Sequence, residues 1–216
     1  MRIGLISDTH LPSLMRHLDE LGPQIGEFLG DVDLILHGGD VVGRAVIDWC
    51  EQYAPTLVSR GNNDIFDDPR TADVQRLTVD GWRIAMTHEL RPEGRPMAEL
   101  LQATLPDEEV DILIGGDTHL ERLEYRAGVV LINSGSPTLP HHKDTRLGTV
   151  ALIETAPDRL HAEIVSLGHT EGHANPGTPQ HIEIEARRIV AASYDGTPAG
   201  PDEISALITR SQDPDA

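Results

Sequence analysis

The chain has 216 residues, of which 38% are hydrophobic, and this is enough apolar material for one domain with its own core. Its 36 acidic and 17 basic residues give a formal net charge of −19. A surface this acidic repels phosphate backbones, which excludes duplex nucleic acid as an expected partner. No apolar run approaches the roughly 20 residues that a membrane helix requires, so we expect no membrane association.

The first residues and the single cysteine both favour a cytoplasmic protein. The apolar stretch at residues 3–6 is too short for a signal peptide, and a candidate ligand follows it directly. Cys50 is the only cysteine, so no intramolecular disulfide can form, which suits a reducing compartment. We therefore predict a cytoplasmic location.

Alternating strands and helices are predicted for the first part of the chain. Residues 2–7, 33–37 and 55–59 are short apolar runs typical of buried strands. Between them, apolar residues at helical spacing predict one helix over residues 14–28 and another over residues 45–53. This β-α-β-α-β order implies parallel strands with right-handed crossovers, and ligands of such sheets bind beyond the carboxyl ends of the strands.

Strands dominate the following part of the chain. Residues 74–79 and 83–86 are joined through Asp80-Gly81, which predicts a hairpin. A helix is predicted over residues 96–105. Further short strands are expected at residues 110–114, 123–126, 129–133, 149–153 and 161–167. The pattern favours an α/β fold in which two sheets form a sandwich flanked by helices.

The character of the chain changes after Leu167. Residues 168–177 have the composition of a linker, and residues 181–192 fit either a strand or a helix. The end of the chain, rich in Gly, Pro and Asp, is expected to have low order. We predict a domain at residues 1–167 and a C-terminal linker and extension of unassigned role at residues 168–216.

Five short polar stretches each follow a predicted strand. They are Asp8-Thr9-His10, Gly39-Asp40, Gly61-Asn62-Asn63-Asp64, Thr87-His88 and Gly116-Asp117-Thr118-His119. Their carboxylate, imidazole and amide groups are metal ligands, and they converge if the strands lie side by side with their C-terminal ends at one rim. Asp8 or Asp40 alone could instead cap a following helix. All five stretches in this order favour a centre for two divalent ions.

The ordered set resembles the calcineurin-like metallophosphoesterase superfamily, and within it the small prokaryotic phosphodiesterase branch. The family pattern runs D-x-H, G-D, G-N-x-D or G-N-x-E, a lone His, and G-H-x-H, and the likeness covers residues 1–167. It implies an αββα sandwich. On the family plan, one ion is held by Asp8, His10 and His119, the other by Asn62, His88 and Asp117, and both are bridged by Asp40.

The resemblance implies a phosphodiesterase that hydrolyses small phosphodiesters through a hydroxide bridging two divalent ions. Manganese is the expected metal, with nickel, cobalt, iron, zinc or magnesium as alternatives. Two other functions remain open on the same fold. One is a phosphomonoesterase or pyrophosphatase, and the other is a non-catalytic protein scaffold, because the pattern is also similar to the retromer subunit with this fold. The expected partner is a small phosphoester, and an oligomer remains open.

Two departures from family patterns alter the expected chemistry. Asp117 stands where the family usually has His, so three ionised carboxylates and a hydroxide would cancel the charge of two dications. Monoanionic diesters should then be favoured over dianionic monoesters. Asn63 stands where the protein phosphatase branch has a His that protonates the leaving oxygen, and asparagine can donate a hydrogen bond but no proton. Good leaving groups should therefore be preferred.

The predicted catalytic residues are Asn63, Asp64 and His88, with Asp64 expected to orient a ligating or nearby histidine. The stretch at residues 133–137 resembles the family's N-P-G-S turn and is expected to shape the rim of the site. His141, His142 and Lys143 follow in a loop. They either contact the substrate or remain in solvent.

Overall fold

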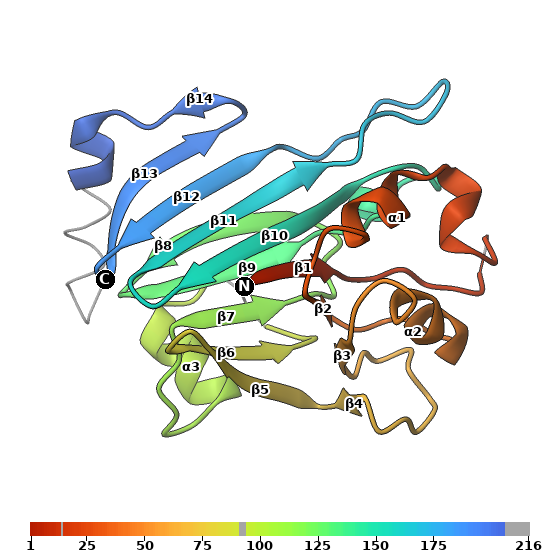
Figure 1. Cartoon of the computed structure of the whole chain (residues 1–216), viewed down its shortest axis with the longest axis horizontal. Coiled ribbons are helices and arrows are strands. Elements are labelled where there is room, and N and C mark those ends of the chain that lie inside the picture. Colours follow the sequence, from red (N-terminus) through yellow and green to blue (C-terminus); the bar gives the residue numbers. More distant parts are fainter. Residues whose placement is uncertain (14, 91–93, 206–216) are drawn as a thin grey trace.

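Two β-sheets packed face to face form the centre of the protein (Figure 1). This computed structural model describes residues 1–13, 15–90 and 94–205. The larger sheet has, from edge to edge, β14 (Thr197–Pro198), β13 (Arg188–Tyr194), β12 (Gln180–Glu185), β11 (Arg159–Ser166), β10 (Thr149–Ala156), β1 (Arg2–Ile6), β2 (Leu34–His37), β3 (Thr56–Ser59) and β4 (Thr71–Ala72). The smaller sheet has β5 (Val74–Val79), β6 (Trp82–Thr87), β7 (Ile112–Gly115), β9 (Val129–Ser134) and β8 (Glu121–Arg126).

Parallel strands form one end of the larger sheet and the centre of the smaller sheet. β1, β2 and β3 pair in parallel, as the predicted β-α-β-α-β order requires. In the smaller sheet β7 pairs in parallel with β6 and β9, and the predicted hairpin through Asp80-Gly81 is the antiparallel pair β5–β6. Parallel neighbours end on the same side, so the segments after β1, β2, β3, β6 and β7 can meet at one rim.

Helices cover the outer face of each sheet. α1 (Gln24–Leu29) and α2 (Arg44–Cys50) pack on the larger sheet through a buried cluster that includes Ile6, Ile25 and Ile47. α3 (Met97–Thr104) packs on the smaller sheet through a second cluster that includes Leu100 and Leu113. A third cluster, which is the largest, fills the space between the sheets. The predicted α/β sandwich flanked by helices is therefore confirmed.

The continuous helix predicted over residues 14–28 is wrong. In its place the structure has a short 3-10 helix, η1 (Leu18–Leu21), and then α1, while residue 14 lies outside the described residues. Gly22 separates the two with a φ of 114°, and Pro23 follows as the N-cap of α1. Proline lacks the N–H that a continuing helix needs, so the apolar spacing spans two elements.

The chain after Leu167 continues the larger sheet. β12 pairs antiparallel with β11, and β13 and β14 follow in order at the sheet edge. Residues 181–192, which fit one strand or one helix by sequence, are most of a hairpin whose turn residues Ala186 and Arg187 have φ of 47° and 63°. The boundary at residue 167 stays a prediction. Residues 206–216, which include the expected poorly ordered chain end, lie outside the described part.

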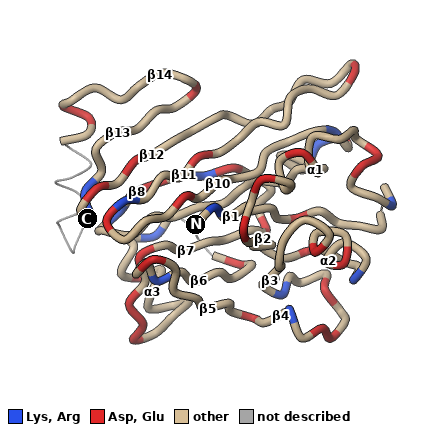
Figure 2. Tube along the Cα trace, viewed as in Figure 1, with Lys and Arg blue, Asp and Glu red and all other residues tan. Residues whose placement is uncertain are grey.

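Acidic residues are spread over the loops and strands of the described chain, with arginines among them (Figure 2). Some are held in ion pairs, such as those of Arg70 with Asp48, Glu51 and Asp68 at 2.7–2.9 Å. The acidic residues of the described chain are therefore not confined to one part of the fold. Among the helices of the described residues, none has the length and apolarity needed to cross a membrane.

Candidate metal centre

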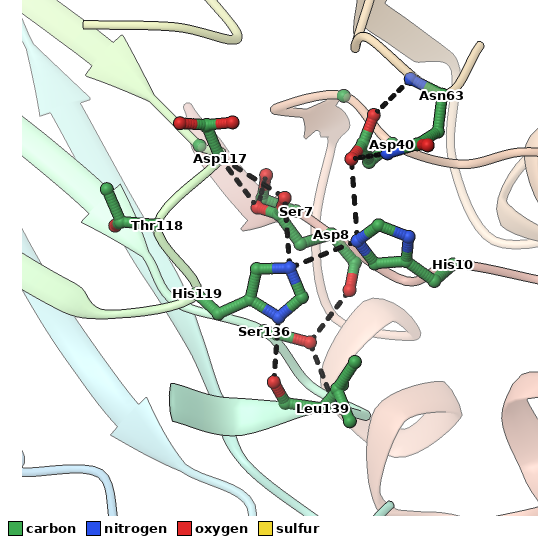
Figure 3. A network of polar contacts seen from close by, with 12 residues as sticks. Ser7, Asp8, His10, Asp40, Asn63, Asp117, Thr118, His119, Ser136 and Leu139 are labelled. Atoms are coloured by element: carbon green, nitrogen blue, oxygen red, sulfur yellow. Dashed lines mark hydrogen bonds and ion pairs between the residues drawn. The ribbon is translucent and has the colours of Figure 1, made fainter. Parts of the chain in front are cut away.

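The seven predicted ligands lie at the carboxyl ends of five strands. Asp8 and His10 follow β1, Asp40 follows β2, Asn62 follows β3, His88 follows β6, and Asp117 and His119 follow β7. Both sheets contribute, so the site lies where the two layers meet. Figure 3 shows Asp8, His10, Asp40 and His119 brought together there from segments far apart in the sequence.

A left-handed backbone turns most of these side chains out of the sheets. The φ angles are 54° at Asp8, 49° at His10, 55° at Asp40, 67° at Asp117 and 55° at His119. Residues other than glycine adopt this region infrequently, and Asp and His are enriched among those that do. The turn lets residues two apart in the chain face one point, as Asp8 and His10 do. Such strained positions cluster at functional sites.

The first group of ligand atoms comes from Asp8, His10 and His119, and these atoms lie within 4.8 Å of one another. The Nε2 atom of His119 is 3.0 Å from Nε2 of His10 and 3.6 Å from Oδ1 of Asp8. Nδ1 of His119 donates to the carbonyl oxygen of Leu139 at 2.8 Å. Because neutral imidazole carries one proton, this bond leaves the lone pair on Nε2, which faces the group.

The second group surrounds His88. Its Nδ1 donates to the carbonyl oxygen of Gly38 at 2.7 Å, which again directs the other ring nitrogen to the site. That Nε2 atom is 3.2 Å from Oδ1 of Asn62, 3.5 Å from Oδ1 of Asp40 and 3.8 Å from Oδ1 of Asp117. His88 is buried while Asn62 is exposed, so this group has a closed inner side and an open outer side.

Asp40 lies between the two groups. Its Oδ2 is 3.4 Å from Nε2 of His10, and its Oδ1 is 3.5 Å from Nε2 of His88. One carboxylate oxygen thus faces each group, as a bridging ligand requires. Asp8 belongs to both sets of neighbouring ligand atoms, because it also lies within 4.8 Å of Asp40 and His88. The geometry fits the predicted bridging place of Asp40.

The electrostatics of the site favour a cation. Burial, together with the carboxylates of Asp40 and Asp117, raises the pKa of Asp8 to about 7 against the opposing effect of His88. Burial also lowers the pKa of His119 to about 4, with His142 adding to the effect. Crowded carboxylates beside imidazole lone pairs form a donor set that fits hard or borderline divalent ions.

Asp40 and His88 each stabilise the charged form of the other. Burial opposes charge on both, yet the hydrogen bond between them raises the pKa of His88 to about 9, with help from Asp8 and Gly38. The pKa of Asp40 is lowered despite its burial by His88 and by two bonds from Asn63. Asp40 is therefore ionised across the ordinary pH range and available to a metal ion.

Asp64 holds the backbone around Asp40. Its Oδ2 accepts the N–H groups of Asp40 at 3.0 Å and Gly61 at 2.8 Å, and its Oδ1 accepts that of Val42 at 2.7 Å. These are backbone partners, so the expectation that Asp64 orients a histidine is wrong. The loops that contain Gly61 and Asp40 pass close to each other. A Cβ on Gly61 would lie 2.2 Å from the backbone nitrogen of Asp40, so no larger residue fits at this position.

Asn63 contacts Asp40 rather than standing free at the rim. Its backbone N–H donates to Oδ1 of Asp40 at 2.9 Å, and its Nδ2 donates to Oδ2 at 2.6 Å. These bonds orient the carboxylate that faces both groups. The side chain is exposed, and its predicted contact with a phosphoryl oxygen stays a prediction.

Two serines support Asp8 in ways that sequence reasoning missed. Ser7 Oγ donates to Oδ2 of Asp8 at 2.5 Å, and Ser136 Oγ donates to the backbone carbonyl of Asp8 at 2.7 Å. Ser136 also accepts the N–H of Leu139, whose carbonyl holds His119 (Figure 3). The turn at residues 133–137 pointed to this region. Through Ser136, this turn connects the segment that contains Asp8 to Leu139, which accepts the hydrogen bond of His119.

The model of the calcineurin-like phosphoesterase superfamily domain matches residues 1–158. The chain belongs to this superfamily. A protein of Methanothermobacter thermautotrophicus named "Probable metallophosphoesterase" is 31% identical over 169 residues, which are 78% of this chain and 94% of that one. A protein of Methanocaldococcus jannaschii, also named a probable metallophosphoesterase, is 33% identical over 142 residues, or 65% of this chain and 70% of that one.

Solved structures share the fold. Vacuolar protein sorting 29 from Cryptosporidium parvum aligns with a TM-score of 0.68 at 20% identity, covering 85% of this chain and 97% of that one. A structure described as that of a novel archaeal phosphodiesterase aligns with a TM-score of 0.51 at 25% identity, covering 72% and 94%. The predicted family and fold class are thus confirmed.

The place of Asp117 at the open side of the second group gives a testable expectation. If Asp117 is a ligand, Asp117→Asn should lower metal occupancy while the fold is retained, because a negative side chain is lost. Asp117→His should remain active with a changed metal preference, since imidazole suits zinc, nickel and iron better than manganese. Metal content by mass spectrometry and rates with each ion measure both effects. Unchanged stoichiometry and rate in Asp117→Ala would place the residue outside the site.

Proposed function

We propose that this chain is a metal-dependent phosphodiesterase with two divalent ions, and that it hydrolyses small phosphodiesters in the cytoplasm. The observation that carries the proposal is the position of Asp40, with one oxygen toward His10 and the other toward His88 at 3.4 and 3.5 Å. Both sequence relatives are named as metallophosphoesterases, and a solved neighbour is described as an archaeal phosphodiesterase.

The residues fit two ions, of which manganese is the expected kind. Such ions would supply a nucleophile from water at neutral pH and stabilise the charge of the phosphoryl group. The chain's own part is to hold them with Asp8, His10 and His119 on one side and Asn62, His88 and Asp117 on the other. The hydrogen bonds that His88 and His119 donate to the carbonyl oxygens of Gly38 and Leu139 fix the orientation of the two rings.

Charge supports a diester over a monoester. Three carboxylates, Asp8, Asp40 and Asp117, surround the proposed centre, and the chain has a net charge of −19. With a hydroxide, the three carboxylates would cancel the charge of two dications, so a second negative charge on the substrate would gain little attraction. A diester carries one charge where a monoester carries two. Asn63 lies beside Asp40 and has no proton to give to the leaving oxygen.

A non-catalytic protein scaffold on the same fold is the second candidate. Ile65, two residues after Asn63, is 95% exposed, and Leu120, next to His119, is 48% exposed. Exposed apolar side chains contribute to surfaces that bind partners where they belong to a contiguous patch. A scaffold would bind its partner without bound metal and without turnover, so measuring both distinguishes it from the proposed enzyme.

Removing and restoring metal tests the proposed function. A chelator should abolish hydrolysis of bis(4-nitrophenyl) phosphate, and Mn²⁺, Ni²⁺ or Co²⁺ should restore it, because the ions would supply the nucleophile from water. Metal content and rate are measured on the same sample. Activity that survives complete removal of metal would overturn the two-ion proposal. Absence of both bound metal and turnover would favour the scaffold.

The leaving group should control the rate. Because Asn63 cannot donate a proton, kcat/KM should rise steeply as the leaving-group pKa falls, and aryl diesters should be better substrates than alkyl monoesters. The measurement is kcat/KM over a series of substituted phenyl diesters and the matching monoesters. Asn63→His should selectively improve poor leaving groups, by up to about 10² to 10⁴ in rate if the imidazole is well placed. A flat series or a clear monoester preference would contradict the charge argument.

A further inference from the structure

The loop that contains the helical turn η2 (Pro140–His142) is tied to the ligand His119 at two points. The carbonyl oxygen of Leu139 accepts the ring N–H of His119 at 2.8 Å, and the backbone N–H of His141 donates to the carbonyl oxygen of His119 at 3.0 Å. This loop therefore forms a wall of the metal centre next to the first group of ligands.

Two consecutive histidines in this loop make different contacts. His141 and His142 both have left-handed backbone, with φ of 56° and 53°. The Nε2 atom of His141 donates a hydrogen bond to Oε2 of Glu121 at 2.7 Å. The ring of His142 lies over the ring of His119, with centroids 3.8 Å apart, and its side chain is exposed. His142 thus stands at the mouth of the centre.

Glu121 holds the loop of His141 and His142 in place through hydrogen bonds. Its side chain is only 7% exposed, and both of its oxygens are used, Oε2 by His141 and Oε1 by the backbone N–H of Thr178 at 2.8 Å. Thr178 lies beyond the part of the chain that matches the superfamily model. Asn175 anchors the same segment, since its Nδ2 donates to the carbonyl oxygen of Gly148 at 2.7 Å. The C-terminal segment therefore supports the wall of the metal centre through Glu121.

A phosphoryl group at the centre needs donors from the protein as well as metal ions. On the side of Asp40, one donor of the Asn63 amide is engaged, because its Nδ2 donates to Asp40. The loop that holds His142 is rich in donors: it also has Lys143, which is exposed and is the only lysine of the chain. A ring N–H of His142 can donate to an oxygen that a metal ion does not take.

We propose that His142 is a substrate-binding residue that donates a hydrogen bond to the phosphoryl group, and that Glu121 is the positioning residue that holds its loop. This inference rests on the proposed function, because it assigns a contact within the same site. It gives the segment around residues 175–178 a role in substrate binding through the Thr178–Glu121–His141 chain of contacts.

Replacement of His142 tests the direct contact. In the manganese-loaded full chain, His142→Ala should raise KM for bis(4-nitrophenyl) phosphate and the inhibition constant of inorganic phosphate by about tenfold, as loss of a hydrogen bond to a charged group predicts, with less effect on kcat. Metal content should be unchanged. The control is His173→Ala, which removes an exposed histidine from another loop and should leave both constants unchanged. Unchanged constants in His142→Ala would overturn the proposal.

Replacement of Glu121 tests the positioning role. Glu121→Ala should reproduce the increase in KM and in the phosphate inhibition constant, and Glu121→Gln should restore most of the affinity because an amide can bond both partners. Combined with His142→Ala, Glu121→Ala should add little, since both act on one contact. Glu124→Ala on the same strand is the matched control. A fall in thermal stability with no change in either constant would mean that Glu121 is merely structural.

Failure of the proposed function is distinguishable from failure of this inference. If the manganese-loaded wild-type chain turns over no phosphoester, the proposed function fails. Calorimetric titration of the same protein with inorganic phosphate then still reports on His142. Equal phosphate affinity in the wild type and in His142→Ala would overturn the proposed contact, and a tenfold loss would support it.

Discussion

Replacing Asp40 with alanine should reduce kcat/KM for phosphodiesters by more than about 100-fold, which exceeds the loss typical of residues that only support a ligand. The reason is its position, with one oxygen toward His10 and the other toward His88. Asp40→Ala should remain inactive at any metal concentration, because the carboxylate that faces both groups of ligands is lost. Activity is measured with bis(4-nitrophenyl) phosphate over a range of Mn²⁺ concentrations.

The control for this prediction is Asp31→Ala, which removes a carboxylate that is 79% exposed and pairs with Arg2 on the protein surface. Its activity should match the wild type. Circular dichroism should show that Asp40→Ala still folds, so that the lost rate reports on the site. Recovery of wild-type activity by Asp40→Ala at high Mn²⁺ would show that Asp40 is only one of several interchangeable ligands. The bridging assignment would then be wrong.

The convergence of the predicted ligands on one rim could be expected from sequence because strand ends are easy to locate. Short apolar runs stop at Asp8, Asp40 and His88, and parallel pairing brings their ends to one rim whatever the details of the loops. Asp8 and Asp40 have a left-handed backbone, which turns their side chains out of the sheet and which no sequence pattern marked. Distances between ligand atoms depend on this backbone and follow only from the structure.

Elements that depend on a turn were harder to predict. The spacing of apolar residues suggested one helix over residues 14–28, but Gly22 and Pro23 divide this range into two helical segments. Both segments turn their apolar residues toward the core, so the spacing alone does not reveal the break between them. The hairpin β12–β13 turns at Ala186 and Arg187, which lack the Asn-Gly or Asp-Gly signal of tight turns. No local pattern therefore marked the point at which the chain reverses.

The partners of Asp64 illustrate a second limit. A conformation in which the N–H groups of Asp40, Val42 and Gly61 all point at one carboxylate is set by how two loops meet, and sequence spacing carries no information about it. The same holds for Glu121, whose two partners lie 20 and 57 residues away in the chain. Both carboxylates are buried and act on the site through backbone or loop contacts.

Replacing Asp64 with alanine should lower the free energy of unfolding by about 3 kcal/mol or more, because three backbone donors would lose their acceptor at about 1–3 kcal/mol for each one left buried. Metal affinity should also fall by about 10- to 100-fold, since the loops that position Asp40 and Asn62 would loosen. Urea unfolding and metal titration measure the two effects.

The matched control is Asp67→Ala in the same loop. The Asp67 side chain is 103% exposed and pairs with Arg60 at 3.5 Å, and such an exposed ion pair contributes little to stability. If Asp64→Ala unfolds within about 0.5 kcal/mol of the wild type, as an ordinary surface substitution does, then the three hydrogen bonds are replaced by water and the loop is held by other contacts.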